Sequence, residues 1–342
     1  MTDERTKKIL ICRTDKIGDV ILTLPVISNL RKAFPGAVID YLAREYTKKI
    51  LEGNPGLNTV LIFDPVKHKG LAGIHRLSAL IESGNYDIAL VLYPRFTLAA
   101  ALFKAGVKTR IGTAFRWYSF LFNERVRLHR KNSEKHELEY NLDLLEPLKI
   151  TAAEKSIKLF LTETERTFAK EFLLKNGLDG KKVITVHPGA AVSVLNWPAA
   201  KYAELIEELG RQSLAEVVLV EGRGEEAITE EIMRAVSKKP VLLSGSADIR
   251  QIGAVLELAV LHISSNTGTM HVAAAVGTPT LSFFNPVIAV SPKRWGPWGN
   301  KSIIISPAVE NCKKCSKQDC RHYNCMDKIE VREVLDKIRE AV

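Results

Sequence analysis

Short runs of β-branched and other apolar residues alternate with segments of helical periodicity along most of the chain, and this alternation limits the folds open to it. Strands that alternate with helices form parallel sheets covered by helices on both faces. The expected fold class is therefore α/β, with two Rossmann-like, doubly wound domains and a cleft between them. Ten strands are predicted, at residues 8–12, 37–41, 59–63, 88–92 and 109–111 and at residues 183–186, 217–220, 241–243, 261–263 and 280–283.

The length of 342 residues suits two domains. The strand pattern lapses at residues 149–158, before a helical segment at 163–174, so the boundary is expected there. We predict an N-terminal domain over residues 1–155, a C-terminal domain over 156–325, and an amphipathic helix within 326–342.

Positive charge is concentrated in the first half. Residues 1–150 hold 24 Lys and Arg against 16 Asp and Glu, and the stretch from Arg95 to Lys131 has nine basic residues and one acid. Such a face attracts phosphate groups on nucleic acid, anionic lipid or glycans, or it is simply a solvated surface. The N-terminus lacks the apolar core of a secretion signal, so we expect a cytoplasmic protein, and contact with the inner face of the inner membrane stays open.

Four loops rich in small residues directly follow predicted strands of the second half, at residues 187–191, 221–226, 244–249 and 264–271. Small residues let backbone N–H groups approach an anion, and a helix that begins at the loop adds its positive dipole end. We predict a phosphate site here, although turn chemistry alone selects similar residues. His187 and His271 border these loops and either contact the ligand or serve the local structure. No G-x-G-x-x-G or P-loop motif is present.

The first predicted strand leads into RTDKIGDVILTLP at residues 13–25, where Asp15 and Asp19 flank Gly18. A carboxylate at the junction of a strand and a helix can take a proton from an acceptor hydroxyl. The alternative is that Asp19 only caps the following helix.

Four of the five cysteines lie close together in the sequence, at Cys312, Cys315, Cys320 and Cys325. A structural zinc, disulfides or free thiols, and an iron–sulfur centre are all compatible with this spacing. Cys12 lies in an apolar run and is expected in the core.

Several motifs together resemble the ADP-heptose:lipopolysaccharide heptosyltransferase family over about residues 7–340. They are R-T-D-x-I-G-D-x-x-L-T-x-P at 13–25, H-P-G-A at 187–190, N-W-P at 196–198, S-N-T-G-x-M-H-x-A-A-A-x-G-x-P at 265–279 and W-G-P at 295–297. The resemblance implies a GT-B glycosyltransferase that adds heptose to the lipopolysaccharide inner core. It also implies inverting transfer without a metal or other cofactor, with the acceptor on the N-terminal domain and the nucleotide-sugar on the C-terminal one.

The resemblance also implies roles for individual residues. Asp19 matches the catalytic base. The donor site would hold Ala190, Ala191, Glu225, Asn266, Thr267, Gly268 and His271. The basic side chains Arg95, Arg110 and Arg116 would suit an acceptor that carries phosphate and acidic sugars. No nucleic-acid partner is expected, because no recognition motif for one is present.

Two positions depart from the family pattern. Leu195 stands where a phosphate-binding Lys is usual, and Asn266 stands where an Asp is usual. The donor is therefore open, and a catalytically weak or altered-donor binding relative is the alternative. Arg223, in a neighbouring loop, is the candidate substitute for the Lys.

Overall fold

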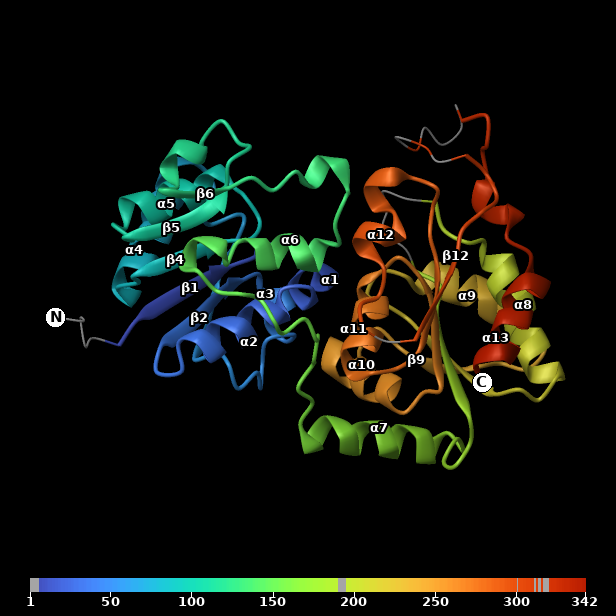
Figure 1. The fold of residues 1–342 in the computed structure, drawn as a ribbon. Coiled ribbons are helices and arrows are strands. Elements are labelled where there is room, and N and C mark those ends of the chain that lie inside the picture. Colours follow the sequence, from blue (N-terminus) through green and yellow to red (C-terminus); the bar gives the residue numbers. More distant parts are fainter. Residues whose placement is uncertain (1–5, 190–194, 300, 311, 313–314, 316–319) are drawn as a thin grey trace. The chain divides into compact units, whose positions relative to one another are not determined.

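The computed structural model describes residues 6–189, 195–299, 301–310, 312, 315 and 320–342 (Figure 1). The predicted donor residues Ala190 and Ala191 lie outside this description. The chain forms two compact units, Met1–Ile157 (unit 1) and Lys158–Val342 (unit 2). Each is described by itself below.

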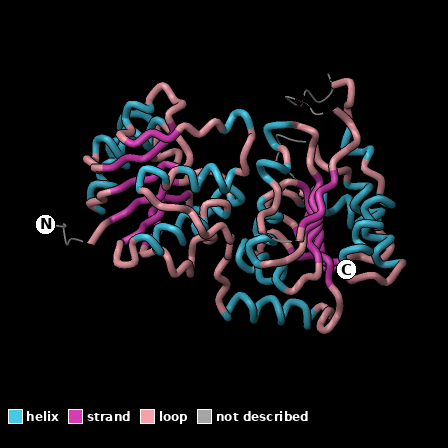
Figure 2. The backbone as a smooth tube through the Cα atoms, in the orientation of Figure 1, coloured by secondary structure: helices cyan, strands magenta, loops and turns pink. Residues whose placement is uncertain are grey.

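Unit 1 contains one parallel sheet in the order β3-β2-β1-β4-β5-β6, with helices on both faces (Figure 2). Leu10 and Cys12 of the central strand pack against α4 and α5, which confirms Cys12 as a core residue. The strands are β1 (Lys8–Cys12), β2 (Val38–Ala43), β3 (Thr59–Ile62), β4 (Ile88–Val91), β5 (Thr109–Thr113) and β6 (Glu124–Val126). The α-helices are α1 (Ile17–Ile21), α2 (Leu24–Ala33), α3 (Glu45–Lys48), α4 (Gly70–Gly84), α5 (Phe96–Lys104) and α6 (Glu137–Asp143), with short 3-10 turns η1 (Ser119–Leu121), η2 (Arg130–Asn132) and η3 (Glu146–Leu148).

Unit 2 repeats this plan, with a parallel sheet in the order β12-β11-β10-β7-β8-β9. Helix α8 contacts α9 and α13, while α10 contacts α7 and α11. The strands are β7 (Val183–His187), β8 (Glu216–Val220), β9 (Val241–Leu243), β10 (Leu261–Ser265), β11 (Thr280–Phe283) and β12 (Ser302–Ile305). The helices are α7 (Glu163–Lys175), α8 (Ala199–Arg211), α9 (Glu226–Ala235), α10 (Ile249–Glu257), α11 (Gly268–Val276), α12 (Pro292–Trp295) and α13 (Val331–Ala341), with 3-10 turns η4 (Ile288–Val290) and η6 (Cys325–Lys328).

All ten predicted strands are present, and the prediction misses only the sheet-edge strands β6 and β12 among those described. β6 has three residues, of which Glu124 and Arg125 are exposed, so it lacks the apolar run that marks a buried parallel strand. β12 is an edge strand of the sheet in unit 2, and its Ser302 and Ile304 side chains are exposed.

The strand order changes direction once in each sheet, between β1 and β4 in unit 1 and between β7 and β10 in unit 2. In sheets of this type, ligands bind beyond the carboxyl ends of the strands at that point. The α/β fold class with two Rossmann-like halves is confirmed. Among the helices that the structure describes, none combines the length and the apolar character needed to cross a bilayer.

Candidate functional site

At the switch point of unit 1, the residue after β1 organises a cluster of charged side chains. The Arg13 side chain is only 2% exposed. Its Nη2 donates to Asp19 Oδ1 at 2.6 Å, and its Nε donates to Asp15 Oδ1 at 2.8 Å. Its Nη1 donates to Glu137 Oε1 at 3.0 Å and to Asn141 Oδ1 at 2.9 Å. Arg13 therefore joins the β1–α1 loop to helix α6.

Two short helices position these partners. Asp19 is the third residue of α1, whose N-cap is Lys16, so the interpretation of Asp19 as a helix cap is wrong. Its carboxylate instead accepts the hydrogen bond from Arg13. On α6, Glu137 and Asn141 lie one turn apart and so share a face, which is the face toward the guanidinium.

The charge balance of the cluster makes Asp19 bind a proton more readily than an isolated carboxylate. Arg130 adds a second guanidinium, with its Nε 3.4 Å from Glu137 Oε1, so three carboxylates surround two positive charges. Burial raises the pKa of Asp19 to about 6, and the charges of Asp15 and Glu137 act in the same direction while Arg13 opposes them. Asp19 is thus a carboxylate at neutral pH that binds a proton more readily than an ordinary Asp.

The three predicted acceptor-binding arginines divide into two groups. Arg95 follows β4, and its Nε donates to Thr14 Oγ1 at 3.2 Å, beside Arg13. Arg116 follows β5, and both Arg95 and Arg116 interact electrostatically with Tyr118. Arg110 lies near the amino end of β5, where its guanidinium donates to the carbonyl oxygens of Val107 and Leu121. The structure therefore brings Arg95 and Arg116 to the carboxyl edge, but not Arg110.

At the switch point of unit 2, His187 at the end of β7 meets residues that follow β8 and β10. Its Nε2 lies 2.8 Å from Glu225 Oε2, and its Nδ1 lies 3.0 Å from Thr269 Oγ1 and 3.4 Å from Thr267 Oγ1. With Glu225 ionised, the imidazole proton is on Nε2, so Nδ1 accepts from a threonine hydroxyl. In the structure, His187 thus takes part in a network of side chains that follow three strands.

Two glycines make room for the Glu225 carboxylate. A Cβ atom on Gly189 would lie 2.0 Å from Glu225 Oε1, and one on Gly222 would lie 2.6 Å from Oε2. The backbone N–H of Gly222 donates to Glu225 Oε2 at 2.8 Å. Burial by itself would raise the pKa of Glu225, but the His187 ring and the Gly222 N–H bring it below its usual value. The small residues of these two loops therefore hold an ionised Glu225.

The network continues into the sheet beneath the predicted phosphate loop. Thr269 Oγ1 lies 3.3 Å from Nε2 of the fully buried His262, whose Nδ1 lies 3.0 Å from Thr185 Oγ1. Burial lowers the pKa of His262 to about 3, so this ring is neutral. Helix α11 begins at Gly268, and its N-cap Thr267 makes no side-chain capping bond, so its hydroxyl bonds within the network. His271 is buried on the same helix.

The two residues that depart from the family pattern both have structural contacts. The Leu195 side chain packs against the apolar core of unit 2, and its carbonyl accepts from Asn285 Nδ2 at 2.6 Å. Asn266 Nδ2 donates to the Val290 carbonyl at 3.3 Å, a bond that an aspartate could not donate. Arg223 is exposed in the loop between β8 and α9.

The four clustered cysteines are all unpaired, and Cys325 is buried at the start of η6. Burial raises the pKa of the Cys325 thiol, and the charges of Cys315, Cys312 and Cys320 add to the effect. Across the described residues, no three His, Cys, Asp or Glu side chains converge in the arrangement of a metal site.

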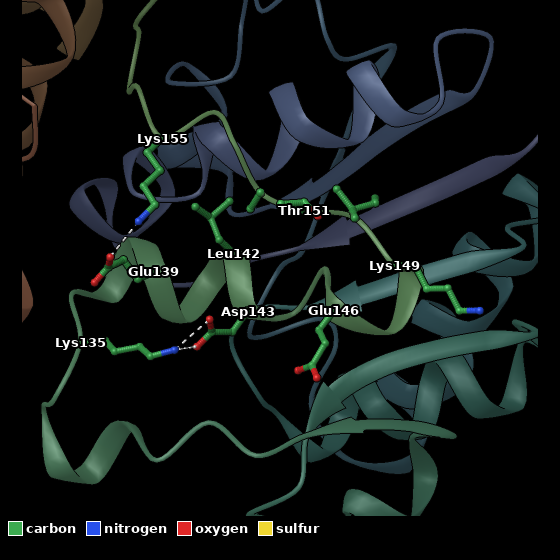
Figure 3. Close-up of a pocket in the computed structure, with 10 residues that line it drawn as sticks. Lys135, Glu139, Leu142, Asp143, Glu146, Lys149, Thr151 and Lys155 are labelled. Atoms are coloured by element: carbon green, nitrogen blue, oxygen red, sulfur yellow. Dashed lines mark hydrogen bonds and ion pairs between the residues drawn. The ribbon is translucent and has the colours of Figure 1, made fainter.

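A groove of about 700 Å³ also lies on unit 1, along the outer side of α6 (Figure 3). Its charges are largely paired with one another, since Lys135 Nζ lies 2.9 Å from Asp143 Oδ2 and Lys155 Nζ lies 3.0 Å from Glu139 Oε1. It contains none of the predicted site residues, whereas the Arg13 cluster uses the other face of the helix.

With this geometry established, comparisons with known proteins give the family. Glycosyltransferase family 9 (heptosyltransferase) matches residues 74–326. A Haemophilus influenzae protein provisionally described as a glycosyltransferase is 29% identical over 314 residues, which are 88% of this chain and 89% of that protein. Lipopolysaccharide heptosyltransferase 3 of Escherichia coli K12 is 28% identical over 308 residues, 84% of each chain. The solved E. coli ADP-heptose lps heptosyltransferase II covers 98% of both chains with a TM-score of 0.80 at 21% identity.

The chain therefore belongs to glycosyltransferase family 9, the heptosyltransferase family, because the family matches about three quarters of its length. The GT-B fold and the assignment as a glycosyltransferase are confirmed with it. The family match begins at residue 74, downstream of Asp19, so it assigns no role to Asp19.

Proposed function

We propose that this glycosyltransferase moves heptose from a nucleotide-heptose, ADP-heptose first among the candidates, to the lipopolysaccharide inner core. The family and the named activities of its relatives support the substrate class. The observation that carries the reaction is the Asp19 carboxylate, held by Arg13 at the switch point of unit 1 with its pKa raised to about 6.

In the proposed step, Asp19 accepts the proton of an acceptor hydroxyl as its oxygen attacks the anomeric carbon of heptose. The bond from that carbon to the diphosphate oxygen breaks, and the nucleoside diphosphate leaves with the electron pair. One displacement inverts the anomeric configuration. A positioned base of suitable pKa contributes about 10²–10⁴-fold to such a transfer.

The donor would be bound by unit 2, and the acceptor by unit 1 with Arg95 and Arg116. The N-terminus of α11 suits a diphosphate, because backbone N–H groups and the helix dipole stabilise the charge that develops on the leaving group. By the resemblance, Glu225 would contact the ribose. Asn266, Thr267, Gly268 and His271 would complete the donor site, with Ala190 and Ala191 assigned to it by the resemblance alone.

The test is transfer measured by mass spectrometry, with a panel of nucleotide-sugars against defined lipopolysaccharide core acceptors. We expect a product heavier by one heptosyl residue, with inverted anomeric configuration by NMR, at a rate unchanged by EDTA. Nucleotide binding without turnover on any acceptor would favour the alternative, a binding relative that has lost activity. No binding of any nucleotide-sugar would refute both.

Leu195 bears on donor binding, because this position holds an apolar side chain and not the phosphate-binding Lys that the resemblance leads us to expect. We propose that Arg223 takes this role from the neighbouring loop. Arg223→Ala is then expected to weaken binding of ADP by about tenfold, a typical loss for one charge-assisted contact. Unchanged affinity in calorimetry would mean that Arg223 has no part in the site.

For the cysteines, we propose a structural zinc bound by Cys312, Cys315, Cys320 and Cys325, since four thiols on a short segment are a donor set that zinc prefers. Binding would have to draw together side chains that do not converge among the residues that the structure describes. Metal analysis of aerobically and anaerobically purified protein tests it. Iron with acid-labile sulfide would indicate an iron–sulfur centre. Thiols that titrate freely without metal would indicate free thiols, and thiols that titrate only after reduction would indicate disulfides.

We also propose that the protein acts in the cytoplasm, where nucleotide-sugar donors would be available to unit 2. Fractionation of cells that express the full chain would test this, with recovery in the periplasmic fraction as the contrary result.

A further inference from the structure

Large aromatic side chains are exposed together on one side of unit 1. Trp117 is 73% exposed, Phe120 67% and Phe103 57%, and Phe96 is also exposed. Isolated apolar side chains are common on protein surfaces, but a contiguous group of aromatics indicates a binding surface.

Ring contacts, a shared helix face and one bond to the backbone link these residues. The Phe96 and Trp117 rings stack with centroids 4.9 Å apart. Phe120 lies in η1, where the adjacent Leu121 carbonyl accepts from Arg110 Nε at 2.8 Å. The Arg110 guanidinium in turn lies over the Phe103 ring, 5.3 Å from its centroid. Phe96 and Phe103 are seven residues apart on α5, which places them on the same face of that helix.

Basic residues accompany the aromatics. Lys104, which follows Phe103 in the sequence, and Lys108 are exposed, and so is Arg116, which precedes Trp117. The stretch from Arg95 to Lys131 has a single acid, Glu124, against nine Lys and Arg. We call this the aromatic–basic surface, defined by Phe96, Phe103, Lys104, Lys108, Arg116, Trp117 and Phe120.

We propose that the aromatic–basic surface docks on a lipid bilayer that carries anionic headgroups. Aromatic rings partition to the boundary between headgroups and acyl chains, while Lys and Arg are attracted to the anionic surface. The combination fits a membrane better than an acidic protein, because Trp117 and Phe120 would be buried in the interface and the surrounding charges would stay in the headgroup layer.

The position of this surface also connects it with the proposed site. Phe96 directly follows Arg95, whose Nε donates to Thr14 beside the Arg13 cluster. A lipid-anchored acceptor would then present its sugars next to the carboxyl edge of the sheet while its acyl chains stay in the bilayer. This second statement rests on the proposed function, whereas membrane docking itself does not.

The test is partition of the full chain onto vesicles, measured by sedimentation and by Trp emission. The probes are phosphatidylcholine alone and phosphatidylcholine with phosphatidylglycerol at a ratio of about three to one. We expect partition onto the anionic vesicles only, weakened by salt. The double variant Trp117→Ser/Phe120→Ser and the double variant Lys104→Glu/Lys108→Glu should each reduce it by about tenfold or more.

Leu174→Ser is the matched control, because Leu174 is 65% exposed on α7 of unit 2, outside the surface. It should partition like the unchanged protein. All variants should keep their circular dichroism spectrum and their affinity for ADP. Transfer to a water-soluble core oligosaccharide should be unchanged in Trp117→Ser/Phe120→Ser, and transfer to an acceptor anchored in vesicles should fall.

Equal partition of the wild-type chain and both double variants, or none onto anionic vesicles, would overturn the proposal. A dimer in light scattering that Trp117→Ser/Phe120→Ser dissociates, without vesicle binding, would assign the surface to a second copy of the chain. Absence of transfer to every acceptor, with vesicle binding intact, would refute the proposed function and leave the docking surface standing.

Discussion

The two units have the same strand order, but the groups gathered at their switch points differ in kind. In unit 1, Asp19 is one of three carboxylates that cluster with two guanidinium groups. In unit 2, the ionised Glu225 bonds to the His187 ring, which in turn bonds to the Thr269 hydroxyl. One topology thus supports a charged cluster in one place and a mostly neutral hydrogen-bond network in the other.

The difference matches the chemistry that we propose for each unit. A base has to change its protonation state, and burial among like charges is what raises the pKa of Asp19 to about 6. A diphosphate site has to offer fixed dipoles without reacting, and hydroxyl and N–H groups do so at a small desolvation penalty. Substitutions in the two units should therefore have different signatures, in turnover for unit 1 and in donor affinity for unit 2.

The largest expected effect is that of Asp19→Asn. Loss of the base should lower kcat/KM by about 10³-fold, while affinity for ADP, a property of unit 2, stays the same. Transfer kinetics and calorimetry measure the two quantities. Asp15→Asn is the control, because Asp15 also accepts from Arg13 but lies before α1, and its effect should be much smaller. An Asp19→Asn protein with more than a tenth of normal activity would contradict the role of Asp19 as the base.

In unit 2, Glu225→Gln should weaken ADP binding by about tenfold, because a neutral amide cannot reproduce the charge-assisted hydrogen bonds that the carboxylate accepts from the His187 ring and the Gly222 N–H. The neighbouring Glu226→Gln provides the control, since Glu226 is exposed at the start of α9. Calorimetry should separate the two variants. Equal affinities would mean that the network around His187 does not organise the donor site.

The pH dependence of kcat/KM tests the role of the charged cluster in unit 1. Activity should rise as Asp19 ionises, so kcat/KM should show an acid limb with an apparent pKa of about 6. Glu137→Gln removes a negative charge that raises this pKa, so the limb should move to lower pH, by roughly one unit or less. Glu139→Gln, on the opposite face of α6 and paired with Lys155, should leave the limb in place. A limb that stays at the same pH in both variants would contradict the role of the cluster.

The smallest expected effect concerns stability. Because the folded-state pKa of Asp19 lies above its ordinary value of 3.8, the folded chain binds more protons between about pH 4 and pH 6, and the Asp19 contribution falls as pH rises through that window. The Asp19→Asn variant does not lose this stability, because its amide does not ionise. Its melting temperature should equal that of the wild type near pH 4 and exceed it by roughly 2–4 °C at pH 7. A variant less stable than the wild type at pH 7 would mean that the bond to Arg13 outweighs the burial of the charge.

Much of the fold could be predicted, since each buried strand carries its own apolar pattern. Two of the four edge strands were missed. β6 mixes the charged Glu124 and Arg125 with a single buried apolar residue, whereas nothing in the structure explains why the apolar run of β12 was missed. The site was predicted less completely. Glu137 and Asn141 are 124 and 128 positions from Arg13, and no local pattern links them to it. The one available signal was their spacing of four, which puts both on the same face of a helix.

The sequence by itself determined the α/β class, the two halves and the motif that singles out Asp19, because these follow from residue patterns between near neighbours. Only the tertiary structure decided that Arg13 and α6 surround Asp19, that Arg110 bonds to backbone carbonyls away from the carboxyl edge, and that Leu195 packs into the core. The physical reason is that burial and charge at a site come from segments far apart in the chain, which meet only when the sheet is assembled.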